Sequence, residues 1–345
     1  MKEERKQIPA PQQEGVRLEE PIGRGTRTFL VFLVSCALLV AVFAVSRIWT
    51  ARKKGSEGQT EPPLSESGEP DGKNGDATEE NGTAATIPDG AVVIRSVDLS
   101  GGELRNETAY SVDPKEIRTL FQTQSYALRP DEPIVLILHT HAQESYRNDG
   151  LPYLTGTLGD AIYSTDPGET VTAVGTAVCQ TLNRAGIPAI QCTALHGEGG
   201  TLRGAYRSAA ECIEKYRRQY PSIQYVIDLH RDGIPDADGA CLRTESPDGK
   251  AQILPIVGTD GNGTACPEWR SNLALALLLY DRLNAGSAGS CRAVSLRNFS
   301  YNQELAPHSL LLEIGSSGNT VSEAIDAGIR IGTALAELIA PIAAD

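Results

Sequence analysis

The chain has no surplus of basic residues: 31 Lys and Arg stand against 44 Asp and Glu among its 345 residues, for a formal net charge of −13. A nucleic-acid-binding protein needs surplus Lys and Arg to neutralise phosphates, so the composition excludes that class. The seven cysteines include no Cys-x-x-Cys pair, which leaves thiolate zinc sites and thioredoxin-like chemistry without support. Their spacing does not decide between disulfides and small buried apolar side chains.

Charge is also absent from residues 29–46, an apolar stretch that follows a polar N-terminal region. Extended to residue 49, this stretch is long enough to cross a bilayer, and it predicts a retained single-pass anchor. Residues 1–28 are then a cytoplasmic segment. Lys and Arg flank both ends of the stretch, so the positive-inside rule does not set its orientation.

Large apolar residues are scarce in residues 50–90, which are rich in Gly, Glu, Pro, Ser, Asn and Thr. Such a segment buries too little surface to offset its chain entropy, and we interpret it as a disordered linker. Residues 91–345 remain as one globular domain of ordinary size.

Apolar runs alternate with segments of helical periodicity in this domain. Residues 91–99, 133–141, 188–193, 223–230 and 309–314 are typical of strands, and residues 170–185, 202–220, 269–283 and 321–339 of helices. This alternation predicts an α/β fold with three layers, α/β/α, around a mostly parallel sheet.

Ionisable side chains stand at the ends of three of the apolar runs. His139, His141 and Glu144 end the first, His230 the second, and Glu313 lies in the third. In open α/β sheets, ligands bind outside the carboxyl ends of the strands, so these side chains are expected to converge.

Two imidazoles and one carboxylate form a ligand set that leaves zinc a fourth position for water. His141, Glu144 and His230 supply this set, with His141 and Glu144 three residues apart. His139 competes with His141 as a ligand or orients the ligands from behind. Glu313 is the candidate general base, because an unpaired carboxylate inside a buried strand is costly.

Further polar residues flank His230. Asp228 or Asp232 is expected to hold the imidazole tautomer, and Arg231 to bind a substrate carboxylate. A surface ion pair between Arg231 and Asp232 explains the same spacing equally well. The two remaining histidines, His196 and His308, are interpreted as structural or surface residues. A nucleophilic serine has little support, since Gly315-Ser316-Ser317 does not form a Gly-x-Ser-x-Gly elbow.

From residue 91 to the C-terminus, the chain resembles the stage II sporulation protein P family. The resemblance lies in four blocks in order: VLILHTHAQESY, VGTAVCQTLNRAGI, YVIDLHRDG and YNQELAPHSLLLEIGSSGNTVSEA. The chain departs from the family pattern in the Gly-rich stretch after His196 and at His308.

The resemblance implies an N-acetylmuramoyl-L-alanine amidase-like, zinc-exopeptidase-like fold and a Zn²⁺-dependent hydrolase. The implied substrate is peptidoglycan, cut between muramic acid and the stem peptide and at peptide cross-links during engulfment. The implied partners are sporulation proteins D and M, and the implied location is the mother-cell membrane, with the domain facing the intermembrane space. Asn302, Gln303 and Asn319 match positions where substrate contact is expected.

Two alternatives remain from the sequence. A zinc carboxypeptidase that trims stem peptides uses a similar ligand set and needs an Arg for the terminal carboxylate, for which Arg231 is the candidate. A catalytically inactive wall-binding scaffold would have lost ligands, but His141, Glu144, His230 and Glu313 are all present.

Overall fold

The computed structural model describes residues 91–121, 128–148, 153–154, 162–197, 204–233 and 240–340. The segments predicted at 1–28, 29–49 and 50–90 lie outside these ranges. None of the helices in the described ranges has both the length and the apolar character needed to cross a bilayer.

The described residues form strands and helices that alternate through most of the chain. The strands are β1 (Val92–Val97), β2 (Leu104–Asn106), β3 (Val135–Leu138), β4 (Tyr153–Leu154), β5 (Ala189–Gln191), β6 (Tyr225–Asp232), β7 (Cys241–Thr244), β8 (Ile253–Gly258), β9 (Val294–Arg297) and β10 (His308–Ser316). The helices are α2 (Pro114–Arg118), α4 (Val171–Arg184), α5 (Ala205–Gln219), α6 (Trp269–Gly286) and α7 (Val321–Ile339), with a 3₁₀ turn η2 (Gln303–Leu305).

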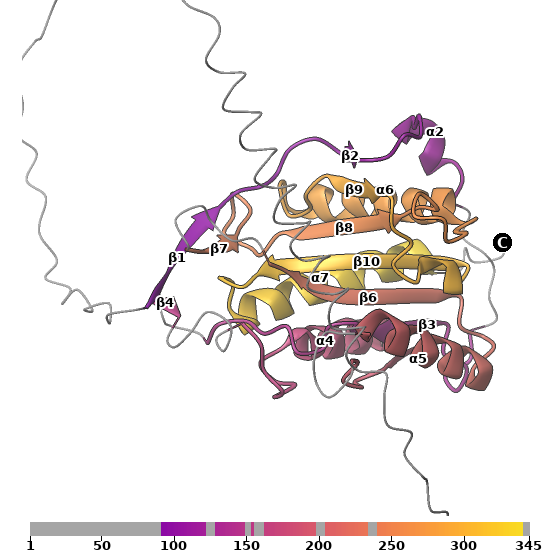
Figure 1. The fold of residues 1–345 in the computed structure, drawn as a ribbon, viewed down its shortest axis with the longest axis horizontal. Coiled ribbons are helices and arrows are strands. Elements are labelled where there is room, and N and C mark those ends of the chain that lie inside the picture. Colours follow the sequence, from indigo (N-terminus) through magenta and orange to yellow (C-terminus); the bar gives the residue numbers. More distant parts are fainter. Residues whose placement is uncertain are drawn as a thin grey trace, which may run out of the picture. The chain divides into compact units, whose positions relative to one another are not determined.

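A seven-stranded sheet forms the centre, in the order β2-β9-β8-β10-β6-β3-β5 (Figure 1). Neighbouring strands are parallel except for β8 and β10, which are antiparallel. The predicted α/β class is confirmed, and every pairing but one in this sheet is parallel.

Helices cover both faces of this sheet. α4, α6 and α7 pack against one another on one face, where alternate strand residues such as Ile137, Ile227 and Leu312 are fully buried. On the other face α5 packs on Leu136, Leu138 and Val226. Because successive strand residues point to opposite faces, each buried strand contributes to both cores. The arrangement has the three layers that the sequence predicts.

Local sequence signals set the helix boundaries close to the predicted ones. The Thr170 hydroxyl accepts from the backbone N–H of Thr172 at the start of α4. Thr320 and Glu323 form a reciprocal capping box at the start of α7. Such caps satisfy backbone N–H groups that have no partner within the helix.

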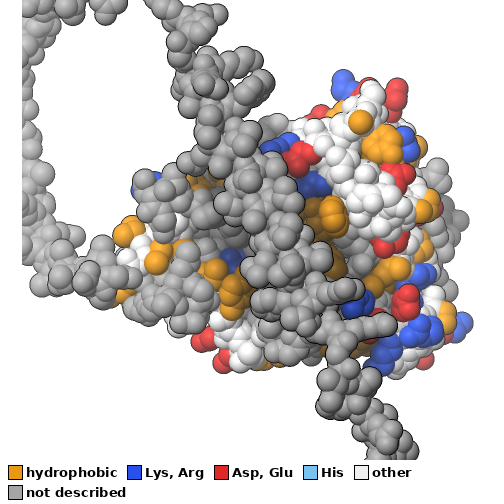
Figure 2. Space-filling model, in the orientation of Figure 1, with side chains coloured by type: hydrophobic (Ala, Val, Ile, Leu, Met, Phe, Trp, Pro, Cys, Tyr) orange, Lys and Arg blue, Asp and Glu red, His pale blue; other side chains and the backbone are white. Residues whose placement is uncertain are grey.

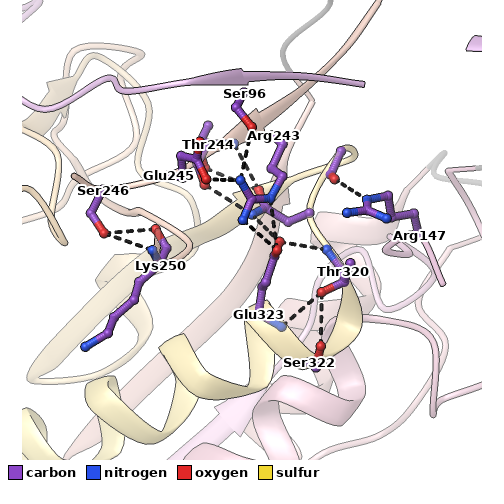
Figure 3. Close-up of polar contacts among 12 residues, drawn as sticks. Ser96, Arg147, Arg243, Thr244, Glu245, Ser246, Lys250, Thr320, Ser322 and Glu323 are labelled. Carbon is purple, nitrogen blue, oxygen red and sulfur yellow. Dashed lines mark hydrogen bonds and ion pairs between the residues drawn. The ribbon is translucent and has the colours of Figure 1, made fainter. Parts of the chain in front are cut away.

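A smaller sheet, in the order β4-β1-β7, is joined to the start of α7 by a polar network (Figures 1 and 3). Arg243 of β7 pairs with Glu245, donates to Glu323 Oε1 at 2.7 Å, and reaches Ser96 Oγ of β1 at 3.0 Å. Although β1 lies in the run predicted to be a strand, it pairs in this second sheet and not in the central one.

The surface visible in Figure 2 mixes Lys and Arg with Asp and Glu, and hydrophobic side chains lie scattered among them. The described part of this face shows no field of a single sign. This pattern agrees with the composition, which contains both 44 acidic and 31 basic residues.

Candidate metal centre

The sheet register places the candidate base beside a candidate ligand. Residues of β10 and β6 pair in parallel, with Leu311 opposite Asp228 and Glu313 opposite His230. Residues paired in this way point to the same face, about 4.8 Å apart across the strands. Asp228 and His230 share the face of Val226, which is covered by α5. Asp228, His230 and Glu313 therefore lie on the α5 side of the sheet.

A tight turn after β3 brings the remaining two candidate ligands to this face. The chain leaves β3 at Leu138 and turns through residues 140–143, and the Glu144 N–H donates to the His141 carbonyl at 3.0 Å. His141 Nδ1 lies 3.3 Å from Glu144 Oε1, and His230 Nδ1 lies 3.6 Å from Glu144 Oε2. The carboxylate of Glu144 thus stands between the two imidazoles.

His141, Glu144 and His230 each present a ligand atom, and these three atoms lie within 4.8 Å of one another. The rings of His141 and His230 are 5.0 Å apart and nearly perpendicular, so they do not stack on each other. The side chains of Glu144 and His230 are 11% and 3% exposed, whereas that of His141 is 20% exposed. The cluster is therefore closed from behind and reached from the His141 side.

The carboxylate of Asp228 lies beside the far nitrogen of His230. Its Oδ2 lies 3.0 Å from His230 Nε2 and accepts from the Thr140 hydroxyl at 2.7 Å, while Oδ1 accepts from the Thr140 N–H at 2.8 Å. A carboxylate behind a histidine fixes its tautomer and frees the other nitrogen for a metal. This placement is the one expected for Asp228, and Thr140 is an additional residue that the sequence did not single out.

The charges of the cluster shift the pKa values of its members. Burial by itself would lower the pKa of His230, but Asp228 and Glu144 raise it well above its ordinary value. Burial would raise the pKa of Glu144, but its contacts with His141 and His230 lower it. Without a cation, the two carboxylates therefore hold a proton on His230, where a metal ion would replace it.

Glu313 differs from the other carboxylates of the site. Its Oε2 atom is buried and has no hydrogen-bond partner among the described residues. Burial raises the pKa of Glu313 to about 8, and the nearby charges of Glu144 and Asp232 add to this rise against the opposing effect of His230. A carboxylate that exchanges a proton near neutral pH suits general acid–base chemistry.

Two imidazoles, one carboxylate and an open side fit a zinc ion with a fourth position free. The buried, partnerless oxygen of Glu313 on the same face fits a group that contacts water or substrate at that ion. The residues present therefore fit the metal that the sequence predicts.

His139 lies on the opposite face of the sheet. Its Nδ1 is 3.2 Å from the Leu229 carbonyl and its Nε2 is 3.0 Å from Gln191 Nε2, and the ring packs against Gly175 of α4. The ring is fully buried, and burial lowers its pKa to about 4. The turn that begins at residue 140 separates His139 from His141, so the structure leaves His139 out of the cluster.

The flanking polar residues mostly serve the protein's own backbone and ion pairs. The Arg231 guanidinium donates to the Ile162 carbonyl at 3.0 Å and to the Asp232 carbonyl at 3.3 Å. The Asp232 carboxylate lies 2.7 Å from Arg292 Nη1, so it pairs with Arg292 and not with its neighbour in sequence. Neither side chain is directed to His230 by these contacts.

The three candidate substrate contacts are also engaged within the fold. Gln303 accepts from the Gly258 N–H and donates to the Ile256 carbonyl, both at 2.9 Å. Asn319 bonds the backbone of Thr244, and Asn302 donates to the Tyr206 carbonyl at 2.8 Å. These amides fix loops near the site and are not brought into the cluster itself. Tyr206, whose ring lies 5.5 Å from that of His141, is a neighbour that the sequence did not indicate.

The family model for stage II sporulation protein P matches residues 50–340. The chain belongs to the stage II sporulation protein P family. Stage II sporulation protein P of Bacillus subtilis (strain 168) is 29% identical over 229 residues, which are 59% of this chain and 52% of that protein. The chain thus spans about half the length of this curated relative.

Solved structures of N-acetylmuramoyl-L-alanine amidases resemble this member of the stage II sporulation protein P family more distantly. The catalytic domain of CwlV from Bacillus (Paenibacillus) polymyxa var. colistinus is 10% identical, with a TM-score of 0.35, over 60% of this chain and 96% of that one. CwlD of Clostridioides difficile, solved in complex with the GerS lipoprotein, is 14% identical with a TM-score of 0.35, over 59% of this chain and 95% of that one. Likeness at these scores does not establish a shared activity.

Proposed function

We propose that this protein is a membrane-anchored, zinc-dependent hydrolase that cleaves amide bonds in peptidoglycan, as an N-acetylmuramoyl-L-alanine amidase with endopeptidase activity. The observation that carries the proposal is the convergence of His141, Glu144 and His230 beside Glu313, whose buried Oε2 has no hydrogen-bond partner among the described residues. Membership of the stage II sporulation protein P family supports a cell-wall role in sporulation, at engulfment.

The residues of the site divide the work of amide hydrolysis. His141, Glu144 and His230 would hold Zn²⁺, and Asp228 would keep His230 oriented. When bound, Zn²⁺ acts as a Lewis acid, polarising a carbonyl and lowering the pKa of water. Glu313 would accept the proton of the attacking water and return it to the leaving amine nitrogen. The buried Oε2 of Glu313, which has no hydrogen-bond partner among the described residues, supports this role because it is available to take and release a proton.

Location and partners follow from the proposed substrate. Peptidoglycan lies outside the cytoplasmic membrane, so a predicted anchor at residues 29–49 would place the N-terminus in the cytoplasm and the catalytic domain outside. In a sporulating cell, that position is the mother-cell membrane facing the intermembrane space. Sporulation proteins D and M are the partners that the family resemblance implies.

The rival carboxypeptidase needs a guanidinium available to a terminal carboxylate. Arg231 is its candidate, but this guanidinium is buried and donates to two backbone carbonyls. The rival scaffold needs an eroded site, whereas the three ligand residues stand together with Asp228 behind them. Both observations favour the amidase.

Digestion of purified peptidoglycan by the full chain in detergent tests the proposal. Mass spectrometry is expected to show released stem peptides for an amidase, separated cross-links for an endopeptidase, and loss of single C-terminal residues for a carboxypeptidase. His141→Ala and Glu313→Gln are expected to abolish release, while Glu337→Gln, an exposed carboxylate paired with Arg282, is expected to match the wild type. Intact substrate with zinc-loaded protein, in the presence of sporulation proteins D and M, would refute the proposal.

A further inference from the structure

A second cluster of ligating side chains lies away from the candidate active site. Cys192 follows β5 directly, His196 lies in the loop after it, and Cys212 belongs to α5. Their ligand atoms all lie within 4.8 Å of one another. These residues share no member with the His141, Glu144 and His230 cluster.

We propose that Cys192, His196 and Cys212 form a second metal site, which takes a thiolate-preferring ion such as Zn²⁺. Two cysteines and one histidine are a donor set that zinc uses when a fourth position is left for another ligand. Zinc–ligand bonds of about 2.0–2.3 Å in a tetrahedron place neighbouring ligand atoms about 3.3–3.8 Å apart, so a spread of at most 4.8 Å is within reach of a single ion.

The histidine supplies an independent observation. His196 is 6% exposed, and its Nε2 is buried without a hydrogen-bond partner among the described residues. Its Nδ1 lies 3.3 Å from Ser208 Oγ. In a metal-ligating histidine, one ring nitrogen usually forms a hydrogen bond with a neighbouring group, and the other nitrogen binds the metal. A buried nitrogen without any partner is otherwise costly.

A pocket gives an ion access to the cluster. It has a volume of about 500 Å³ and is lined by all three ligand residues together with Glu211. A carboxylate and water are both acceptable fourth ligands for zinc, and Glu211 is the carboxylate at hand.

A disulfide is the competing account of the two cysteines. Their sulfur atoms lie 2.8 Å apart, and both residues are free thiols in this structure. A disulfide would use both sulfurs and leave the buried His196 nitrogen unexplained. A metal ion would use all three groups at once, and two thiolates on one zinc ion lie about 3.8 Å apart, so the sulfur atoms would separate from 2.8 Å when the ion binds.

The bound ion would act as a cross-link between the edge of the sheet and α5. Cys212 lies six residues along the helix from Tyr206, or about 9 Å at 1.5 Å per residue. Tyr206 in turn packs against His141. Fixing α5 to the loop after β5 would therefore steady the wall of the candidate active site.

Metal content and cobalt spectra of the full chain in detergent test this site. The chain is first reduced and then equilibrated with a small excess of metal. The Cys192→Ser/Cys212→Ser variant is expected to hold about one zinc fewer than the wild type. Cys179→Ser, which removes a half-buried thiol of α4 outside the cluster, is expected to lose none. In the cobalt-loaded protein, the thiolate-to-metal absorption band is expected in the His141→Ala variant and absent from the double cysteine variant.

The unaltered chain provides a measurement that does not depend on the folding of a variant. Zn²⁺ is expected to slow the modification of two thiols by a disulfide reagent, and mass spectrometry is expected to identify them as Cys192 and Cys212. Equal modification rates with and without zinc, or a cobalt protein without the thiolate band, would overturn the site. If the cysteine variant loses zinc and His141→Ala does not, the second metal site is upheld, and only the proposed zinc site at His141 is contradicted.

Discussion

Replacing Asp228 with Asn separates the charge of this buried carboxylate from its shape. In the wild type, the anion faces His230 Nε2 at 3.0 Å, so the proton of a neutral imidazole stays on Nε2 and the lone pair of Nδ1 faces Glu144. An Asn places an amide NH₂ near Nε2 and favours the opposite tautomer, in which Nδ1 carries the proton. Zinc binding through Nδ1 then requires the imidazole to change its tautomer first.

The expected loss for Asp228→Asn is 10–100-fold in zinc affinity, or about 1.4–2.7 kcal/mol. The hydrogen bonds from Thr140 weaken as well, because the carboxylate accepts from both its N–H and its hydroxyl. Loss of a charge-assisted hydrogen bond costs about 1.5–3 kcal/mol in unfolding free energy. At low pH the wild type holds a proton on His230 that zinc must displace, so the affinity difference is expected to widen as the pH rises.

Competition with a chromophoric chelator measures the zinc affinity, and denaturant unfolding of the metal-free protein measures the stability. Asp232→Asn is the matched control, since this carboxylate pairs with Arg292 instead. Zinc affinity of Asp228→Asn within twofold of the wild type at pH 8 would show that the carboxylate does not orient a zinc ligand.

Three further predictions concern the site and its support. Metal-free Glu313→Gln is expected to have the same unfolding free energy as the wild type near pH 4 and one that is a few kcal/mol higher than that of the wild type at pH 8. The Glu313 carboxyl ionises at a higher pH in the folded chain than in the unfolded chain, so the wild type loses stability relative to the variant as the pH rises from 4.5 to 8; unfolding at several pH values checks this. Zinc binding at pH 7 is expected to release a proton from His230, measured by calorimetry in buffers of different ionisation heat. Gly175→Ala is expected to destabilise the fold by about 1–3 kcal/mol because its methyl group overlaps the His139 ring, whereas Gly286→Ala, with open space around it, is expected to change stability little in the same thermal melts.

Three of the strands that the sequence predicts correctly have continuous apolar character. Residues 133–141, 223–230 and 309–314 overlap β3, β6 and β10, which are buried on both faces and therefore lack the alternation of an exposed strand. β8 has the same burial but was not predicted. Pro255 stands in its middle, opposite Leu312 of β10, and a proline argues against a central strand because it removes a donor.

The pairing of strands depends on contacts that local sequence does not encode. β1 was predicted as a strand, but its partner β7 lies more than a hundred residues away and was not predicted at all. Likewise, hydrophobic periodicity does not indicate that β8 pairs with β10, or that the two strands are antiparallel. Propensity and pattern identify strands better than they identify neighbours.

The same limit applied to the candidate site. Whether His139 and His141 share a face depended on where β3 stops, and one turn beginning at residue 140 separates them. The amides of Gln303 and Asn319 were expected to contact substrate because they match positions in the family resemblance. Buried backbone N–H and carbonyl groups need partners, however, and these two side chains provide them.

The two candidate metal sites differ in whether the spacing of their ligands in the sequence reveals them. His141 and Glu144 are three residues apart, so a single turn brings them together and the motif is visible in sequence. Cys192 directly follows β5 and Cys212 lies in α5 twenty residues later, and no short motif marks them. The absence of a Cys-x-x-Cys pair therefore excluded one local form of thiolate site without excluding one assembled by the fold. In an α/β domain, where each crossover returns the chain to the same sheet, ligands from separate elements meet as readily as neighbours in sequence do.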